Sequence, residues 1–169
     1  MRIRLEFDRI APGVEIGPHR HGVETIVYLA GGELVFEHGE ALERRAVIRA
    51  GDVLYEAPAE HHRIRNEATI DALALLASTD PDPRRLGTML RRWESEAEPV
   101  RRGVDAAVVE ADGIRRRLIV GPGDFGSAAL TVTEVEIAPG VTDEWHRHPH
   151  AEHALVVFEG RGIVTVGDE

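Results

Sequence analysis

The sequence predicts an all-β protein built from two copies of one module. The segment Ile10-Ala11-Pro12-Gly13-Val14 recurs as Ile137-Ala138-Pro139-Gly140-Val141, and His19-Arg20-His21 recurs as His146-Arg147-His148. Both segments recur after the same 127 residues, and such a matched spacing indicates a tandem duplication. Short β-rich runs separated by Gly, Pro and Asn turns indicate that each copy is an antiparallel sandwich or barrel.

Composition is that of a globular protein with one large or two small domains. The 169 residues are 43% hydrophobic and 30% charged. A net charge of −10 argues against nucleic acid as a partner, because phosphate binding needs clustered Lys and Arg. Cysteine is absent, which excludes disulfides and thiolate metal sites. No apolar run resembles a signal peptide or a membrane span, so we expect a cytoplasmic protein with no membrane partner.

The first half of the sequence contains a series of short strands. Residues 2–8 alternate Arg with apolar side chains, which is typical of a strand with one solvated face. The run over residues 25–29 ends in Gly31-Gly32 and forms a hairpin with residues 33–37. Further strands are expected at residues 46–49, 53–56, 63–65 and 71–77.

The pattern changes to helical after this series. Asp82 is a candidate N-cap and Pro83 suits the first helical position. One apolar stripe follows at helical spacing, formed by Leu86, Met89, Leu90 and Trp93. We interpret the stripe as packing surface between the two modules, within a short helical linker over residues 80–102.

Strand signals resume in the second half at residues 106–109, 115–120, 130–137, 154–158 and 162–166. The expected organisation is therefore an N-terminal barrel over 1–79, the linker, and a C-terminal barrel over 103–169. The second module has too few residues to close a barrel, and a half-built barrel exposes strand edges. Either the sequence is part of a longer chain, which we expect, or another chain, such as the second subunit of a homodimer, completes the fold.

Histidines are concentrated in three short clusters that contain eight of the nine. In a protein without cysteine, such clusters suggest a first-row metal bound through imidazole and carboxylate. His19 and His21 are two apart, so on a strand both point to the same face. Glu24 follows as a hard anionic ligand, and His62 is the candidate for the fourth group.

These residues resemble the cupin superfamily. Its first motif is G, five residues, H-x-H, three or four residues, E, six residues, G. The fixed positions are filled by Gly13, His19, His21, Glu24 and Gly31, with two residues between His21 and Glu24. Its second motif is G, five residues, P-x-G, two residues, H, three residues, N. Matching positions are Gly51, His62 and Asn66, while Ala57 and Ala59 stand where Pro and Gly are usual.

The second module resembles the first motif alone. Gly140, His146 and His148 match it, and His153 holds the position of the glutamate, seven residues before Gly160. His153 is therefore the preferred third ligand of a second metal site, with the adjacent Glu152 as the alternative.

The resemblance implies a double-stranded β-helix, or jelly roll, for each module and a bicupin overall. It also implies a divalent Fe, Mn, Ni, Cu or Zn ion in each barrel. We expect a metal-dependent oxidoreductase, a dioxygenase acting on a small organic molecule inside the barrel, with Glu24 as a candidate catalytic base. Two alternatives are a non-catalytic small-molecule-binding or sensor cupin, and a metal-dependent isomerase or lyase that needs no oxygen.

Overall fold

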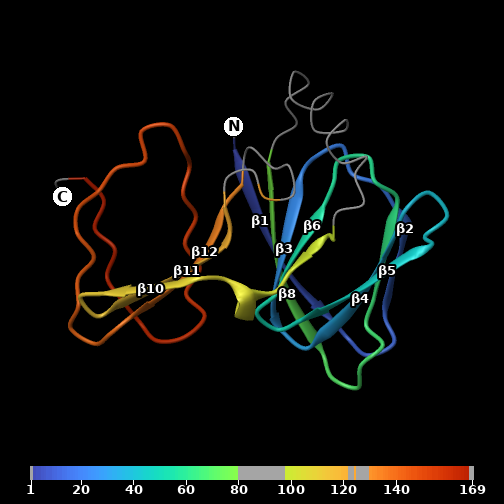
Figure 1. Cartoon of the computed structure of the whole chain (residues 1–169), viewed down its shortest axis with the longest axis horizontal. Coiled ribbons are helices and arrows are strands. Elements are labelled where there is room, and N and C mark those ends of the chain that lie inside the picture. Colours follow the sequence, from blue (N-terminus) through green and yellow to red (C-terminus); the bar gives the residue numbers. More distant parts are fainter. Residues whose placement is uncertain (1, 80–97, 122–123, 125–129, 168–169) are drawn as a thin grey trace.

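The computed structural model describes residues 2–79, 98–121, 124 and 130–167 (Figure 1). Its sheets are antiparallel, and the helix whose residues are all described is a single 3-10 turn at Gly103–Asp105. The predicted all-β class is therefore confirmed. The helix predicted near residues 82–93 lies outside the described residues. Within the part that is described, no helix is long and apolar enough to cross a bilayer.

Two antiparallel sheets form the first module. The five-stranded sheet consists, in spatial order, of β1 (Ile3–Ile10), β8 (Ala72–Thr79), β3 (Thr25–Gly31), β6 (Val53–Glu56) and β9 (Val100–Arg101). The four-stranded sheet consists of β2 (Glu15–His19), β7 (His62–Arg65), β4 (Glu33–His38) and β5 (Arg44–Arg49). β9 was not expected as a strand, and it places the end of the predicted linker at the edge of the first sheet.

One apolar core fills the space between these two sheets. Its buried members come from both sheets: Ile10, Val27, Leu29, Leu34, Phe36, Ala46, Ile48, Leu54, Ile64, Ala72, Ala74 and Val100. Full burial of a Leu, Ile or Phe side chain contributes about 1.5–3 kcal/mol. Because strand side chains alternate between faces, the register that buries this set also decides which polar side chains point inward.

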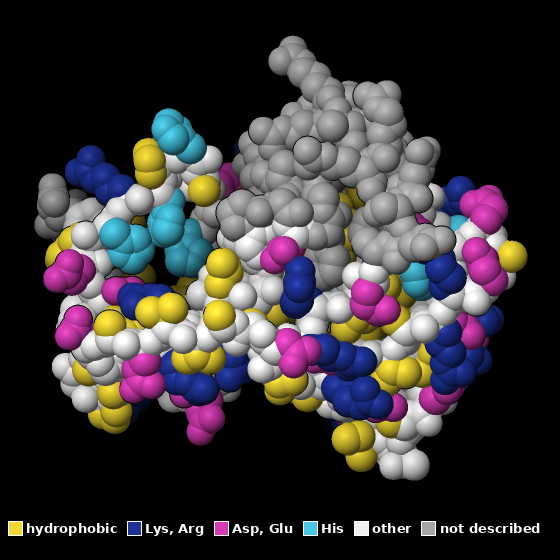
Figure 2. All heavy atoms as spheres, in the orientation of Figure 1, with side chains coloured by type: hydrophobic (Ala, Val, Ile, Leu, Met, Phe, Trp, Pro, Cys, Tyr) yellow, Lys and Arg dark blue, Asp and Glu magenta, His cyan; other side chains and the backbone are white. Residues whose placement is uncertain are grey.

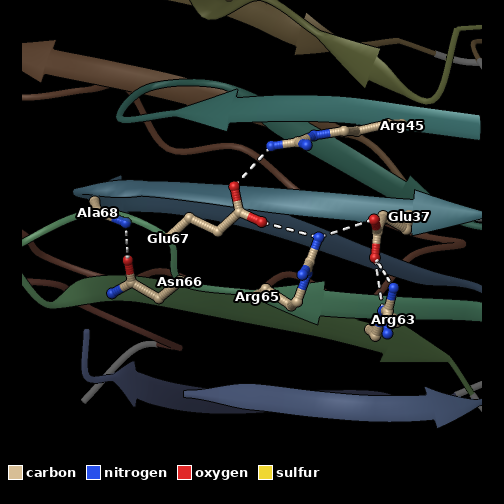
Figure 3. A network of polar contacts seen from close by, with 7 residues as sticks. All are labelled: Glu37, Arg45, Arg63, Arg65, Asn66, Glu67 and Ala68. Atoms are coloured by element: carbon tan, nitrogen blue, oxygen red, sulfur yellow. Dashed lines mark hydrogen bonds and ion pairs between the residues drawn. The ribbon is translucent and has the colours of Figure 1, made fainter. Parts of the chain in front are cut away.

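The outer face of the four-stranded sheet carries a network of charged side chains (Figure 3). Glu37 of β4 accepts hydrogen bonds from Arg63 Nε at 2.6 Å and from Arg65 Nη2 at 2.9 Å, both on β7. Between and beside these arginines, His62 and Ile64 are buried. The alternation along β7 therefore directs its two arginines outward and His62 into the barrel.

Asn66 fastens the end of β7 to neighbouring segments. Its side-chain Nδ2 donates hydrogen bonds to the carbonyl oxygens of Ile10 and Ile70, each at 2.8 Å, and its Oδ1 accepts one from the amide of Ala68 at 3.0 Å. The side chain is 1% exposed. Asn66 thus satisfies three backbone groups where chain segments turn away from the sheets.

The second module contains a three-stranded antiparallel sheet, β10 (Val108–Ala111), β11 (Ile114–Val120) and β12 (Val132–Ile137). The strands expected at residues 154–158 and 162–166 are not formed, and no described segment pairs with either. Their apolar side chains are exposed, among them Leu155, Val157 and Ile163. A strand without a partner gains no ladder hydrogen bonds, which is the physical reason for the difference.

The two modules share a second apolar core. On the outer face of the five-stranded sheet, Ile26 and Tyr55 pack with Ile119, Val120 and Leu130 of the second module. The backbone N–H of Ile3 also donates a hydrogen bond to Glu152 at 2.7 Å. In Figure 1 the orange β11 and β12 lie beside the blue and green strands of the first module.

Candidate metal centre

Three of the predicted ligands, His19, His21 and His62, come together in the first module. His19 ends β2, and the β2–β7 ladder places it opposite His62 at the start of β7. The register shifts between Ile16 and His19, a bulge that brings His19 rather than Pro18 opposite His62. His21 lies two residues beyond His19, in the bend that follows β2.

The ligand atoms of these three histidines all lie within 4.8 Å of one another, and no other described group of three or more such residues does so. The ring centroids of His19 and His62 are 4.4 Å apart, and those of His21 and His62 are 4.8 Å apart. The Nε2 atoms of His21 and His62 are separated by 3.1 Å. A single ion could therefore contact all three rings.

Backbone carbonyls fix the tautomers of two of these rings. Nδ1 of His19 lies 2.8 Å from the carbonyl oxygen of Gly17, and Nδ1 of His62 lies 3.0 Å from that of Glu60. A carbonyl oxygen only accepts hydrogen bonds, so both Nδ1 atoms donate, and in the neutral rings both Nε2 atoms keep a lone pair. This is the arrangement by which proteins orient histidine ligands toward a metal.

Sequence reasoning missed the carboxylate that lies closest to these rings, which belongs to Glu56. Its Oε2 is 3.2 Å from Nε2 of His21, and its Oε1 is 3.8 Å from Nε2 of His62. The carboxylate of Glu56 raises the pKa of His21 above 6.5, against the opposing effect of burial. Burial lowers the pKa of His62 below 6.5. The signal available in the sequence was a glutamate at the end of the apolar run predicted as a strand at residues 53–56.

Glu24 is not part of the histidine group. It is 2% exposed and accepts a hydrogen bond from the hydroxyl of Tyr55 at 3.3 Å. Tyr55 belongs to the core shared by the two modules, on the outer face of the five-stranded sheet. Burial, reinforced by the charge of Glu24, raises the pKa of Tyr55, so its hydroxyl remains the donor. Alternation along β3 thus directs Glu24 away from the barrel interior.

His62 is also supported from within the barrel. Phe36 lies against its ring at 5.5 Å between centroids. The β4–β7 ladder pairs His62 with His38 of β4. Nδ1 of His38 in turn lies 2.8 Å from the carboxylate of Glu60. His38 is 3% exposed. His61 is directed elsewhere, with Nδ1 3.1 Å from the carbonyl oxygen of Glu40.

A second cluster, formed by His146, His148 and His153, lies in the second module. The rings of His146 and His148 are 5.0 Å apart and nearly perpendicular, and those of His148 and His153 are 4.8 Å apart. All three side chains are exposed, and Figure 2 shows histidines gathered on this part of the surface. The carboxylate of Glu152 accepts the hydrogen bond from Ile3 and is engaged with the first module.

The first cluster fits a divalent transition metal by its donor set. Imidazole suits Zn, Cu, Fe and Ni, and a nearby carboxylate suits a site that must offset positive charge. Oε2 of Glu56 is buried and has no hydrogen-bond partner of acceptable geometry among the described residues. A bound cation would satisfy this oxygen together with the two lone pairs on His19 and His62.

Comparison with known proteins finds one family model and several solved structures similar to the chain. Residues 7–78 match the family model described as "Cupin domain". No curated protein matches the chain. Among solved structures, a predicted oxalate decarboxylase from Thermotoga maritima is 31% identical over 44% of this chain and 63% of its own, with a TM-score of 0.40.

Two further solved structures are similar to the chain. A Cupin 2 conserved barrel domain protein from Salinispora arenicola CNS-205 is 22% identical, over 53% of this chain and 71% of its own, with a TM-score of 0.42. The CENP-C cupin domain of Drosophila melanogaster is 16% identical, over 44% of this chain and 56% of its own, with a TM-score of 0.41. The family match covers residues 7–78, less than half of the chain, and supports a cupin fold for the N-terminal module.

Proposed function

We propose that this protein binds a divalent first-row transition metal through His19, His21 and His62 and uses it in an oxidoreductase reaction of the dioxygenase class on a small organic molecule. The observation that carries the proposal is the closeness of the three histidines, whose ligand atoms lie within 4.8 Å of one another. Sites with few protein ligands and open positions are typical of non-haem iron oxygenases.

The residues of the barrel would hold and orient the ion. The Gly17 and Glu60 carbonyls keep the rings of His19 and His62 in one tautomer. His62 is fully buried, whereas the side chain of His21 is 28% exposed. The site is therefore closed behind His62 and open beside His21, where a small molecule would enter. When bound, the metal supplies Lewis acidity and, if redox-active, electron transfer to oxygen.

Two other activities remain alternatives to this proposal. A metal-dependent isomerase or lyase would use the same ligands without oxygen, and a non-catalytic small-molecule-binding protein would use the metal for structure. The discriminating property is therefore the identity of the metal together with oxygen consumption. The second cluster, His146, His148 and His153, is proposed as a second metal site, with Glu152 as the alternative ligand.

The first experiment is elemental analysis of the full chain, purified without chelator and without a histidine tag. The untagged protein would then be tested for oxygen uptake with phenolic and organic-acid substrates. His62→Ala serves as the metal-free control, so that oxygen uptake from contaminating metal is subtracted.

Each outcome selects one activity. Iron, manganese, copper or nickel near one equivalent, with substrate-dependent oxygen uptake absent in His62→Ala, supports the dioxygenase. Substrate conversion without oxygen uptake replaces it with an isomerase or lyase. Zinc with ligand binding and no conversion replaces it with a binding protein. No retained metal, and no binding of added Co²⁺, overturns the metal proposal itself.

A further inference from the structure

We propose that Glu56 is the carboxylate ligand of the metal centre, contributed by β6 of the opposite sheet rather than by Glu24. The inference rests on the proposed metal binding by the three histidines and specifies the fourth ligand. Glu56 is 1% exposed and lies 3.2 Å from Nε2 of His21 and 3.8 Å from Nε2 of His62. It is thus in contact with two of the three rings.

Alternation along β6 explains why Glu56 points inward. Leu54 belongs to the core between the two sheets, whereas Val53 and Tyr55 belong to the core shared with the second module. Side chains two apart share a face, so Glu56 faces the barrel interior with Leu54. The same rule places Glu24 with Ile26 on the outer face, where it meets Tyr55.

The β3–β6 ladder places Glu56 opposite the residue that has the spacing of the motif glutamate. Thr25 is paired with Glu56 across the ladder, and both are buried. Three residues separate Thr25 from His21 and six separate it from Gly32, as in the motif, whereas only two residues separate Glu24 from His21. At this spacing the glutamate position of the motif is occupied by threonine, and Glu56 supplies a carboxylate from the directly opposite position.

The surroundings of Glu56 favour a cation. Its Oε2 has no hydrogen-bond partner of acceptable geometry among the described residues. Burial of an unpaired carboxylate is costly, so a positive partner is required. Nδ1 of His62 lies against the Glu60 carbonyl, and its Nε2 is 3.8 Å from Oε1 of Glu56. In the neutral ring this Nε2 is an acceptor, so a cation between the two groups would meet an acceptor on each side.

The composition of the site then constrains its substrate. Three neutral imidazoles and one carboxylate around a divalent ion leave a net charge of +1. An anionic oxygen, such as that of a carboxylate or a phenolate, is therefore favoured at the open positions over a neutral or cationic group.

The test compares Glu56→Gln with the matched control Glu24→Gln in the full chain. Both replace a buried glutamate by its isosteric amide, but only one should affect the metal. Co²⁺ is titrated into chelator-treated protein by calorimetry, and the visible Co²⁺ spectrum reports the ligand set. We expect Glu56→Gln to weaken Co²⁺ binding at least tenfold and to change the spectrum, and Glu24→Gln to leave both near wild type.

Other results would overturn the assignment of Glu56 separately from metal binding. Weakening by Glu24→Gln alone would return the ligand role to Glu24. Unchanged affinity and spectrum in both variants, with His62→Ala abolishing binding, would leave a three-histidine site. No Co²⁺ binding to wild type would instead contradict the proposed function. If Glu56→Gln does not fold, Glu56→Asp is used, because it keeps the charge but retracts it, and an unchanged spectrum there counts against the proposal.

Discussion

His19 and His146 stand 127 residues apart and have the same local geometry. Nδ1 of each ring lies 2.8 Å from the carbonyl oxygen two residues earlier, Gly17 in one case and Glu144 in the other. Each ring also meets the next histidine edge-on, at centroid distances of 4.8 and 5.0 Å. The two copies of the repeated segment thus hold a pair of histidine rings in the same relative orientation.

This shared geometry predicts a second, weaker metal site. His146, His148 and His153 are exposed, so water competes with them more effectively than with the buried His62 and the partly buried His19 and His21 of the first cluster. Calorimetric titration with Co²⁺ should therefore show a strong and a weak equivalent. His148→Ala should remove only the weak one, while Arg147→Ala, between the two histidines, should keep both. A single binding phase unaffected by His148→Ala would show that the second cluster binds no metal.

His62→Ala is expected to lose the metal of the first module. The substitution removes the one ligand that is fully buried and shared by both neighbouring rings. His61→Ala is the matched control, because the His61 ring contacts the carbonyl of Glu40 instead. Metal content measured after dialysis should fall to background for His62→Ala and stay at the wild-type level for His61→Ala. Retention of metal by His62→Ala would refute the assignment.

Metal affinity should increase with pH. Nε2 must be unprotonated to bind metal, and Glu56 raises the pKa of His21 above 6.5, so a proton competes with the metal below that raised pKa. Because burial lowers the pKa of His62, a proton on His62 competes with the metal less than a proton on His21 does in this range. Below the raised pKa of His21, Co²⁺ affinity should rise with pH by up to about tenfold per unit, and above that pKa it should level off. Calorimetry at constant ionic strength checks this, and an affinity that is flat or falls with pH would contradict it.

Ala59→Gly should stabilise the protein. Ala59 has φ of +63°, a left-handed conformation that costs a residue with a Cβ about 1–2 kcal/mol. Glycine avoids this cost but gains freedom in the unfolded chain, so we expect a net increase of about 0.5–1 kcal/mol in the free energy of unfolding.

The control for this substitution is Ala57→Gly. Ala57 is fully buried in the core shared by the modules and does not have a positive φ. The same chemical change there should destabilise the fold by about 1 kcal/mol. Chemical denaturation of both variants, with opposite signs expected, provides the measurement. Destabilisation by Ala59→Gly would show that the Ala59 turn is not strained.

Asn66→Ala should destabilise the first module by about 2–4 kcal/mol, because buried backbone groups are left without partners. The variant loses two donors, to Ile10 and Ile70, and one acceptor, for Ala68. Asn66→Asp keeps the acceptor for Ala68 but turns a buried carboxylate oxygen toward the carbonyls of Ile10 and Ile70, so it should be at least as unstable as Asn66→Ala in chemical denaturation. Equal stability of Asn66→Ala and wild type would mean that water replaces these contacts.

The all-β class and the histidine group could be predicted because each depends on local spacing. The segments around residues 25–29, 33–37 and 53–56 contain enough β-forming residues between turns to be recognised, and His19, His21 and His62 follow the motif. Glu56 could not be predicted in the same way. Its proximity to the histidines depends on which residue of β6 pairs with Thr25, and this register is decided by packing across both sheets.

Glu24 illustrates the opposite limit of sequence reasoning. It matched a motif position, but a one-residue difference in spacing moves a strand side chain to the other face. β2 was missed because Gly17 and Pro18 are poor strand formers, and they occupy the bulge that brings His19 opposite His62. The segments at 154–158 and 162–166 have the side chains of a strand but no described strand to pair with. A local sequence pattern does not reveal whether such a partner exists.

The short strand β9 has a consequence for how the protein can be divided. Val100 and Arg101 pair with Leu54 and Val53, and the amide of Tyr55 bonds to the carbonyl of Pro99 at 2.9 Å. A fragment that stopped at Thr79 would therefore leave the backbone of β6 open at the strand that carries Glu56. A fragment designed to keep β6 paired at this edge must therefore extend through β9, at least to Arg101.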